Sequence, residues 1–207
     1  MKILIKYKYL IFPVNKYASE KKLTLSDGLN GEYKLKIRLD NLSPDFDAYI
    51  DVSRFIGREI SVSAEPNMEI RFKESDTMDI PGIYTEDYRP QIHFTTRNGW
   101  LNDPNGLIFI DGKYHMFYQH NPCEPRWGNM HWGHAISRDM IHWEETDIAL
   151  FPDKSGAMFS GSAIADENNL LGLQNGDTPT VLLYYTATEP FSQYLAYSTD
   201  GLKTIHK

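Results

Sequence analysis

A predicted tight turn followed by two apolar segments constrains this chain more than any other feature of its sequence. Residues 98–106 read Asn-Gly-Trp-Leu-Asn-Asp-Pro-Asn-Gly, and Asp-Pro-Asn-Gly has the residue preferences of a type I turn. Two largely apolar segments follow at 107–110 and 113–119, separated by Asp111-Gly112, a dipeptide favoured in two-residue hairpin loops. The sequence therefore predicts a turn at 103–106 that leads directly into a β-hairpin.

Short apolar segments recur beyond this hairpin in two groups. The expected strands of the first group are 107–110, 114–119, 131–137 and 143–150, and those of the second group are 159–165, 181–186 and 194–198. The step Ala135-Ile-Ser-Arg-Asp139 recurs as Ala196-Tyr-Ser-Thr-Asp200 at the end of the third strand of each group. Radially repeated four-stranded sheets are typical of a β-propeller, and two blades do not close a ring. The sequence thus predicts an all-β fold.

The first 85 residues form a different unit. Residues 32–39 alternate charged with apolar side chains, the pattern of a strand with one solvated face. Further strands are expected at 9–14, 22–25, 48–52, 59–64 and 68–72. We therefore expect a small N-terminal β-sandwich with its linker over 1–85 and a partial propeller over 86–207. No catalytic constellation is evident in the sandwich, where aromatic residues such as Tyr49 are expected to pack rather than to bind sugar.

Composition narrows the ligand class. A formal charge of -7 argues against a nucleic-acid backbone as partner, whereas a neutral carbohydrate is compatible with it. The single cysteine, Cys123, rules out an intrachain disulfide and a cysteine metal cluster. His131 and His134 are three apart on an expected strand and would point to opposite faces, so no metal site is predicted. No stretch approaches a membrane span.

The neighbours of Asp103 suggest a chemical role for this carboxylate. Trp100 offers an apolar face, while Asn102 and Gln119 offer amides that both donate and accept hydrogen bonds. This combination suits a sugar, which presents hydroxyl groups and C–H faces. The alternative is that Asp103 only caps its own turn.

Four motifs in order resemble those of glycoside hydrolase family 32, the family of invertases, inulinases and levanases. They are Trp-Leu-Asn-Asp-Pro-Asn-Gly at 100–106, Phe-Tyr-Gln-His-Asn-Pro at 117–122, Trp-Gly-Asn-Met-His-Trp-Gly-His-Ala-Ile-Ser at 127–137, and Phe-Ser-Gly-Ser-Ala at 159–163. The resemblance implies a five-bladed β-propeller, of which this chain would hold about two blades. The first 85 residues resemble the small β domain that precedes the propeller in some bacterial members.

The resemblance implies that Asp103 is the nucleophile of a retaining glycosidase and forms a covalent fructosyl-enzyme intermediate. Nearby amides would keep its carboxylate ionised by hydrogen bonding. Five other residues match family positions that line the pocket of the terminal fructose: Asn102, Gln119, Trp127, Phe159 and Ser160. The amides and Ser160 would bind hydroxyl groups, and Trp127 and Phe159 would form apolar walls. Packing within the blade core is the alternative for each of them.

Two further family motifs are missing from the sequence. The general acid is the Glu of a Glu-Cys pair, yet the only cysteine follows Pro122. An Arg-Asp-Pro motif is also absent, because Arg138-Asp139 is followed by Met140. By resemblance both motifs belong to later blades, beyond Lys207. Four glutamates could in principle replace the acid but are expected at solvated edges instead: Glu124, Glu144, Glu145 and Glu189.

The predicted function is retaining hydrolysis of β-fructofuranosyl bonds in fructan or sucrose, without a metal or cofactor. Loss of the proton donor alone removes a contribution of roughly 10²- to 10⁴-fold, so the 207-residue chain itself is predicted to be inactive or nearly so. Two alternatives stay open: a non-catalytic carbohydrate-binding module, and a related propeller glycosidase acting on arabinan or xylan. Lys6 and Lys8 interrupt the N-terminal apolar run before signal-peptide length. A polymeric substrate is compatible with a secreted or periplasmic parent enzyme, and the localisation is left open.

Overall fold

A computed structural model of the protein describes residues 1–29 and 32–207, and this part of the chain is built from β-strands. Its one helical element is the short 3₁₀ turn η1 (Ser53–Phe55). The predicted all-β fold class is therefore confirmed. Over the same residues, no helix has the length and hydropathy required to span a membrane.

The chain divides into two compact units that interleave along the sequence. The first comprises Met1–Arg89, Arg97–Trp100 and Asn121–Asn129. The second comprises Pro90–Thr96, Leu101–His120 and Met130–Lys207. The domain boundary predicted between residues 85 and 86 stays a prediction.

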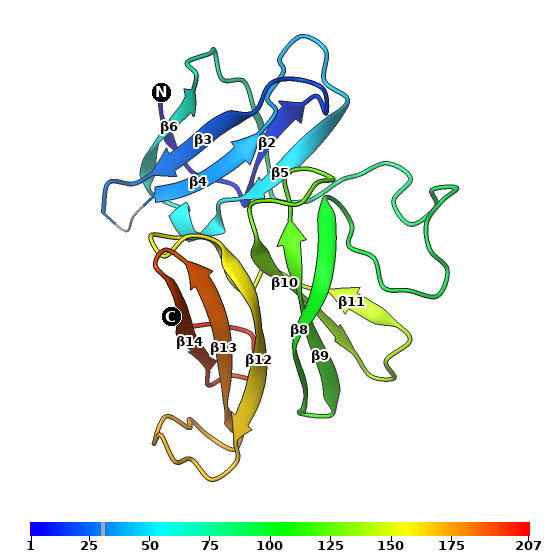
Figure 1. Ribbon diagram of the computed structural model, residues 1–207, viewed down its shortest axis with the longest axis vertical. Helices are drawn as coiled ribbons and strands as arrows, with labels where there is room; N and C mark the ends of the chain where they lie inside the picture. Colours follow the sequence, from blue (N-terminus) through cyan, green and yellow to red (C-terminus); the bar gives the residue numbers. More distant parts are fainter. Residues whose placement is uncertain (30–31) are drawn as a thin grey trace. The chain divides into compact units, whose positions relative to one another are not determined.

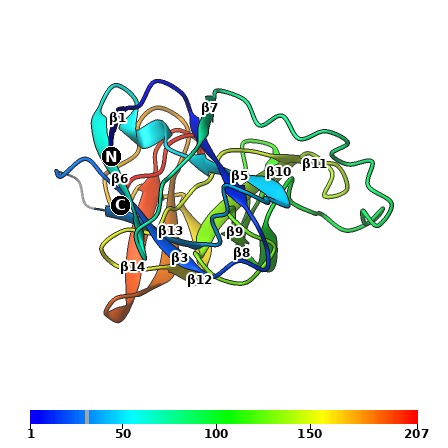
Figure 2. The same ribbon diagram turned by 90° about the horizontal axis from the view of Figure 1, so that it is seen from above.

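The first unit contains two antiparallel sheets (Figures 1 and 2). One has the order β1-β6-β3-β4, formed by Lys2–Leu4, Glu59–Glu65, Lys21–Ser26 and Glu32–Ile37. The other has the order β5-β2-β7, formed by Phe46–Asp51, Tyr9–Val14 and Lys73–Ser75. The strands β1 and β7, which carry no label in Figure 1, are labelled in Figure 2.

Period-2 alternation explains why these segments form strands with one dry face. Along β4 the exposed and buried residues alternate without interruption, so that Tyr33, Leu35 and Ile37 are buried. Strand β6 alternates in the same way, and β4 and β6 lie on either side of β3 in one sheet. The expected packing role of Tyr49 agrees with its burial, and its hydroxyl donates a hydrogen bond to the Asp79 carbonyl at 2.8 Å.

The strand predicted at 68–72 is wrong. The third strand of this sheet is β7, at residues 73–75. Within 68–72, the Glu69 carbonyl accepts a hydrogen bond from the Asn41 side chain at 2.7 Å. The Glu69 carboxylate pairs with Arg71 two residues later. The hydrogen bond from Asn41 satisfies the Glu69 carbonyl outside a ladder.

The rest of the chain forms two further sheets (Figure 1). The first has the order β11-β10-β9-β8, formed by Trp143–Glu145, His131–Ser137, Lys113–Asn121 and Trp100–Ile110. The second has the order β12-β13-β14, formed by Met158–Asp166, Thr180–Thr188 and Phe191–Ser198. Strand β11 is shorter than the predicted 143–150, and Leu150 instead makes an isolated bridge to Trp132.

The hairpin predicted at Asp111-Gly112 is confirmed, whereas the turn predicted at 103–106 is wrong. Asp111 and Gly112 both have positive φ, 50° and 71°, as a type I′ hairpin turn requires. Asp-Pro-Asn-Gly lies within β8 instead. Strand β8 is at the edge of its sheet, where a proline that lacks an N–H group is tolerated.

The repeated Ser-x-Asp step predicted from the sequence is confirmed at the ends of β10 and β14. The Ser137 hydroxyl accepts a hydrogen bond from Asp139 N at 3.1 Å, and Asp139 Oδ1 accepts two more from the following backbone. Ser198 and Asp200 make the corresponding bonds. Each pair closes the chain reversal after the third strand of its sheet.

The core of the second unit is formed by side chains from both of these sheets. Trp132 is fully buried and its ring lies at 5.5 Å from that of Phe117 and 6.4 Å from that of Tyr185. Gly106 has φ of +49°, and a Cβ there would lie 2.9 Å from the Phe117 ring. A glycine therefore lets β8 lie directly on these rings.

Candidate active site

Asp103 lies exposed on β8 and is held by two polar side chains. The Ser160 hydroxyl donates a hydrogen bond to Asp103 Oδ2 at 2.9 Å. A hydrogen bond from the Asn102 side chain, and then that from Ser160, lower the pKa of the Asp103 carboxyl below its ordinary value. Of the six predicted site residues, these three are brought into direct contact. Their arrangement favours an ionised, solvent-accessible carboxylate.

Ser160 reaches Asp103 because of a β-bulge in β12. The register between β12 and β13 shifts between Phe159 and Gly161, so Ser160 has no partner in the ladder. A bulge redirects a side chain in this way. At Gly161, a Cβ would lie 1.8 Å from the Tyr184 carbonyl oxygen, so the bulge requires a residue without a side chain.

Gln119 is buried and hydrogen-bonds to the backbone of the same part of β12. Its Nε2 donates a hydrogen bond to the Met158 carbonyl at 2.9 Å. Trp132 Nε1 donates to the next carbonyl, that of Phe159, at 3.0 Å. Two side-chain donors thus fix the backbone immediately before Ser160. A sugar-binding role of Gln119 stays a prediction.

The two predicted apolar walls have different surroundings. Phe159 is half-buried and its ring makes an edge contact with Phe191 at 6.0 Å. Trp127 belongs to the first unit and is 61% exposed. Since Asp103 belongs to the second unit, the approach of Trp127 to Asp103 stays a prediction.

The expectation that Glu124 lies at a solvated edge is wrong. Its side chain is 3% exposed and forms an ion pair with Arg38 at 2.5 Å. A charge is tolerated in such a place when it is paired and hydrogen-bonded. Glu144 and Glu189 are exposed, while Glu145 accepts a hydrogen bond from Thr96 Oγ1 at 2.8 Å.

The structure contains a buried histidine pair that the sequence does not predict. His115 Nδ1 and His134 Nε2 lie 3.0 Å apart, and the His134 ring stacks on Phe117. Burial, and then the neighbouring His115, lower the pKa of His134 to about 3. Because His134 is paired with Phe117 in the register of β9 and β10, His115 is its diagonal neighbour on the same face. The sequence does not provide this register, because a long segment separates the end of β9 at Asn121 from the start of β10 at His131.

We expect this pair to make the second unit sensitive to acid. A histidine with a depressed folded-state pKa stays neutral in the native protein, while the unfolded chain takes up a proton below its ordinary pKa of 6.5. Stability is therefore complete above pH 6.5 and falls as the pH falls toward 3, by about 2 kcal/mol at pH 5. Urea unfolding at pH 8, 6.5 and 5 measures this slope.

The matched variant for this prediction is His134→Gln. It is expected to be less stable at pH 8 and to lose most of the slope between pH 6.5 and 5, a range above the titration of the carboxylates. A slope equal to that of the parent chain would contradict the prediction.

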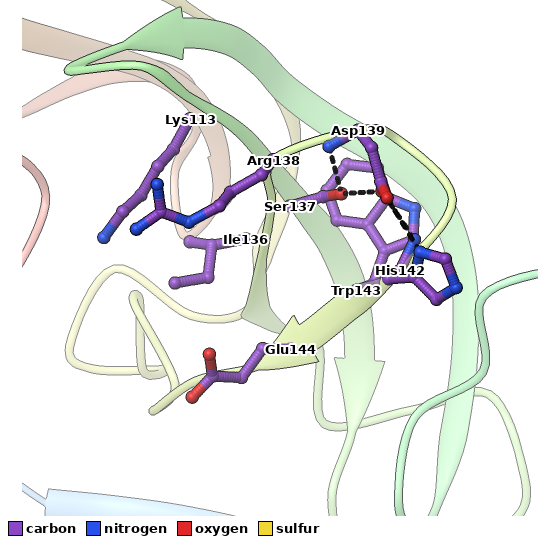
Figure 3. Close-up of a pocket in the computed structure, with 8 residues that line it drawn as sticks. All are labelled: Lys113, Ile136, Ser137, Arg138, Asp139, His142, Trp143 and Glu144. Atoms are coloured by element: carbon purple, nitrogen blue, oxygen red, sulfur yellow. Dashed lines mark hydrogen bonds and ion pairs between the residues drawn. The ribbon is translucent and has the colours of Figure 1, made fainter.

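Two surface hollows of the second unit include neither Asp103 nor Ser160 in their lining. One, of about 420 Å³, surrounds the turn after β10 and is drawn in Figure 3. Its lining is formed by Lys113, Ile136, Ser137, Arg138, Asp139, His142, Trp143 and Glu144. The other, of about 480 Å³, is mostly apolar and begins at Pro104, directly after Asp103.

Within residues 1–29 and 32–207, which the structure describes, no three His, Cys, Asp or Glu side chains gather in an arrangement that could hold a metal ion. His131 and His134 have different partners, since His131 packs edge-on against Phe151.

The hydrogen bond from Ser160 to Asp103 gives a direct prediction. Ser160→Ala removes one of the two side-chain donors that stabilise the charged carboxylate, so the pKa of Asp103 is expected to rise toward its ordinary value. A ¹³C-detected NMR titration of the aspartate carboxyl groups measures it. Ser192→Ala, on an exposed part of β14, is the control and is expected to leave this titration unchanged; equal midpoints in the parent and Ser160→Ala would contradict the prediction.

Comparison with known families covers just over half of the chain. A sequence model of the glycosyl hydrolases family 32 N-terminal domain matches residues 93–207. This range contains all six predicted site residues.

Individual relatives agree with this match. A levanase from Bacillus subtilis is 50% identical over 126 residues, which make up 60% of this chain and 19% of that protein. An invertase from Schizosaccharomyces pombe is 44% identical over 61% of this chain and 24% of its own length. The chain thus spans about a fifth to a quarter of these relatives.

Solved structures give the same result for the fold. An exo-inulinase from Aspergillus awamori superposes with a TM-score of 0.54 at 41% identity, over 59% of this chain and 28% of the other. A β-fructofuranosidase from Schwanniomyces occidentalis, complexed with fructosyl-erythritol, gives a TM-score of 0.57 at 37% identity, over 63% of this chain and 27% of the other.

Proposed function

The chain belongs to glycosyl hydrolase family 32, and we propose that it carries the nucleophile of a retaining hydrolase of β-fructofuranosyl bonds. Its relatives include proteins named levanase and invertase, and the substrate we propose is accordingly a fructan or sucrose. We propose residues 86–207 as the propeller part and residues 1–85 as the accessory β domain with its linker.

The Asp103–Ser160 hydrogen bond is the observation on which the proposal rests. A nucleophile must be ionised and accessible, and Asp103 is exposed, with its pKa lowered by Asn102 and Ser160. In the proposed reaction its carboxylate attacks the anomeric carbon of the terminal fructosyl unit. The bond to the leaving oxygen breaks, a general acid protonates that oxygen, and water later releases fructose from the Asp103 ester.

The remaining predicted residues would bind the fructosyl ring. Asn102 and Ser160 flank the carboxylate and can also reach hydroxyl groups. We propose Phe159 and Trp127 as apolar walls, because sugar C–H faces pack on aromatic rings. Gln119 would act on the substrate as well as on the backbone of β12, since an amide offers donors and acceptors at both of its atoms.

With a nucleophile but no general acid, the chain is expected to separate sugar binding from fructose release. We expect the 207-residue chain to bind sucrose or short fructans weakly and to release little or no fructose. An in-frame Arg-Asp-Pro and Glu-Cys in the DNA that follows the codon for Lys207 would supply the transition-state stabiliser and the general acid that the proposed reaction requires.

Two measurements test the proposal: fructose release from sucrose, inulin and levan, and calorimetric binding of the same sugars. Binding without turnover, with no acid encoded downstream, would favour a non-catalytic sugar-binding module. Release of arabinose from arabinan instead of fructose would overturn the substrate assignment. Absence of both binding and turnover, even in the protein extended past Lys207, would overturn the proposal altogether.

A further inference from the structure

Residues 121–129, which are the last residue of β9 and most of the segment that leads to β10, belong to the first unit. They are called the connector below, and they are fixed to the backbone of β4. Asn129 Oδ1 accepts a hydrogen bond from Lys36 N at 2.8 Å, and Asn129 Nδ2 donates one to Lys36 O at 2.7 Å. A neighbouring strand would make this same pair of bonds. Because β4 is at the edge of its sheet, the side-chain amide of Asn129 takes the place of a further strand at this point.

Glu124 anchors the connector a second time. Its partner is Arg38, two residues after Lys36 in the sequence. Glu124 Oε1 accepts a hydrogen bond from Arg38 N at 2.6 Å, and Glu124 Oε2 pairs with Arg38 Nη1 at 2.5 Å. The Glu124 side chain is 3% exposed and that of Arg38 20%. Arg38 Nη2 also lies 3.6 Å from Glu20. Charge-assisted bonds in such a buried setting are strong and directional.

Internal hydrogen bonds close the connector between its two anchors. Asn121 Oδ1 accepts bonds from Cys123 N at 3.1 Å and from Asn129 Nδ2 at 3.2 Å. Asn121 Nδ2 donates to the Arg126 carbonyl at 2.8 Å. Trp127 lies between the anchors at 124 and 129, and it stays 61% exposed. The connector thus holds its polar groups inside and presents an aromatic ring outside.

We propose that Asn129 and the Arg38–Glu124 pair are positioning residues. Through them, the sheet β1-β6-β3-β4 holds Trp127 in place. This inference rests on the proposed function, in which Trp127 forms a wall for the fructosyl ring. Stacking on a sugar demands a ring held in one orientation. A connector without regular secondary structure opens locally unless it is tied down. The sheet that contains β4 would therefore affect sugar affinity without contributing one of its own side chains to the sugar.

The sharpest variant is Asn129→Gly. Asn129 has a positive φ of 46°, which glycine adopts without strain, so this change removes the amide clamp and spares the backbone conformation. Asn129→Asp is its partner, because it keeps an acceptor for Lys36 N and loses both side-chain donors. Arg58→Ala is the control: it breaks the 2.7 Å ion pair with Asp27 in the same unit, and neither residue belongs to the connector.

Three readouts on the 207-residue chain separate positioning from general stability. They are amide exchange of residues 121–130, acrylamide quenching of Trp127 obtained by difference from a Trp127→Phe counterpart, and calorimetric affinity for sucrose and short inulin. In Asn129→Gly we expect amide exchange to rise about tenfold and sugar affinity to fall about fivefold. In Asn129→Asp we expect changes in the same direction, because a carboxylate oxygen would face the Lys36 carbonyl and Asn121 Oδ1 in place of the donor. Arg58→Ala is expected to change none of the three.

Each outcome decides the inference. Unchanged exchange and quenching in Asn129→Gly would overturn it, and so would faster exchange with unaltered sugar affinity. Equal effects in Arg58→Ala would mean that the Asn129–Lys36 hydrogen bonds only stabilise the first unit, which would also overturn the inference. If the parent chain binds neither sugar, the proposed function fails in this chain, and the exchange and quenching measurements still decide whether Asn129 and β4 hold Trp127.

Discussion

Gly161→Ala is expected to destabilise the second unit by about 3 kcal/mol or more, because there is no room for a methyl group at the bulge. Its Cβ would lie 1.8 Å from the Tyr184 carbonyl oxygen and 2.8 Å from Tyr185 Cα. Both neighbours are backbone atoms of β13, which cannot move away as the end of a side chain can. Relief requires β12 and β13 to separate at the bulge.

The loss has a functional consequence as well. Separation of the strands would withdraw Ser160 from Asp103, so the pKa of Asp103 is expected to rise in Gly161→Ala as it does in Ser160→Ala. Urea unfolding followed by tryptophan fluorescence measures the stability, and the carboxyl NMR titration measures the pKa.

Gly112→Ala is the matched control for the steric effect. A Cβ at Gly112 would meet nothing within 4 Å, but φ is +71°, so only the backbone cost of about 1–2 kcal/mol applies. Similar losses in the two variants would contradict the steric explanation and would mean that β12 tolerates a side chain at position 161.

Local turn chemistry and strand periodicity were the most predictable parts of this fold. Asp111-Gly112 predicted its hairpin correctly because two residues with positive φ leave few alternatives. The alternation along β4 likewise placed Tyr33 and Leu35 in the interior. Both predictions depend on neighbours within a few residues.

Predictions that depended on distant partners were less successful. Asp-Pro-Asn-Gly has the residue preferences of a turn, but it lies in β8. Because β8 is an edge strand, it tolerates Pro104, which has no N–H group to donate to a ladder. Glu124 was predicted to be solvated, but it pairs with Arg38, which is 86 residues away in the sequence. Local propensity contains no information about such partners.

The candidate site shows the same division. The resemblance predicted functional roles for Asp103 and Ser160, and the structure brings the two residues into contact although they are 57 residues apart. The bulge that brings them together is possible because Gly161, which has no side chain, lies directly against the Tyr184 carbonyl. No pattern in a single sequence reveals this close approach. Family motifs thus recorded a three-dimensional contact whose physical reason appears only in the structure.

Asp103→Asn is expected to lower the rate of fructose release by at least about 10³-fold in the protein extended through the codons that follow Lys207. The amide is nearly the same size as the carboxylate and can still accept a hydrogen bond from Ser160, so the fold and the sugar affinity are expected to change little. What is lost is the anionic oxygen that attacks the anomeric carbon. Initial rates on sucrose, inulin and levan measure the effect.

Two glutamates provide the control for this loss. Glu144 and Glu189 are exposed, and Glu144→Gln and Glu189→Gln are expected to retain the parent rate. A fall in rate in either variant would make that glutamate a candidate for the acid. Trapping distinguishes a nucleophile from a merely structural aspartate: a slow fructosyl donor should leave a fructosyl ester on the peptide that contains Asp103. If Asp103→Asn keeps its activity, or if the ester forms on another carboxylate, the chemistry is carried by another residue and the contact with Ser160 is only structural.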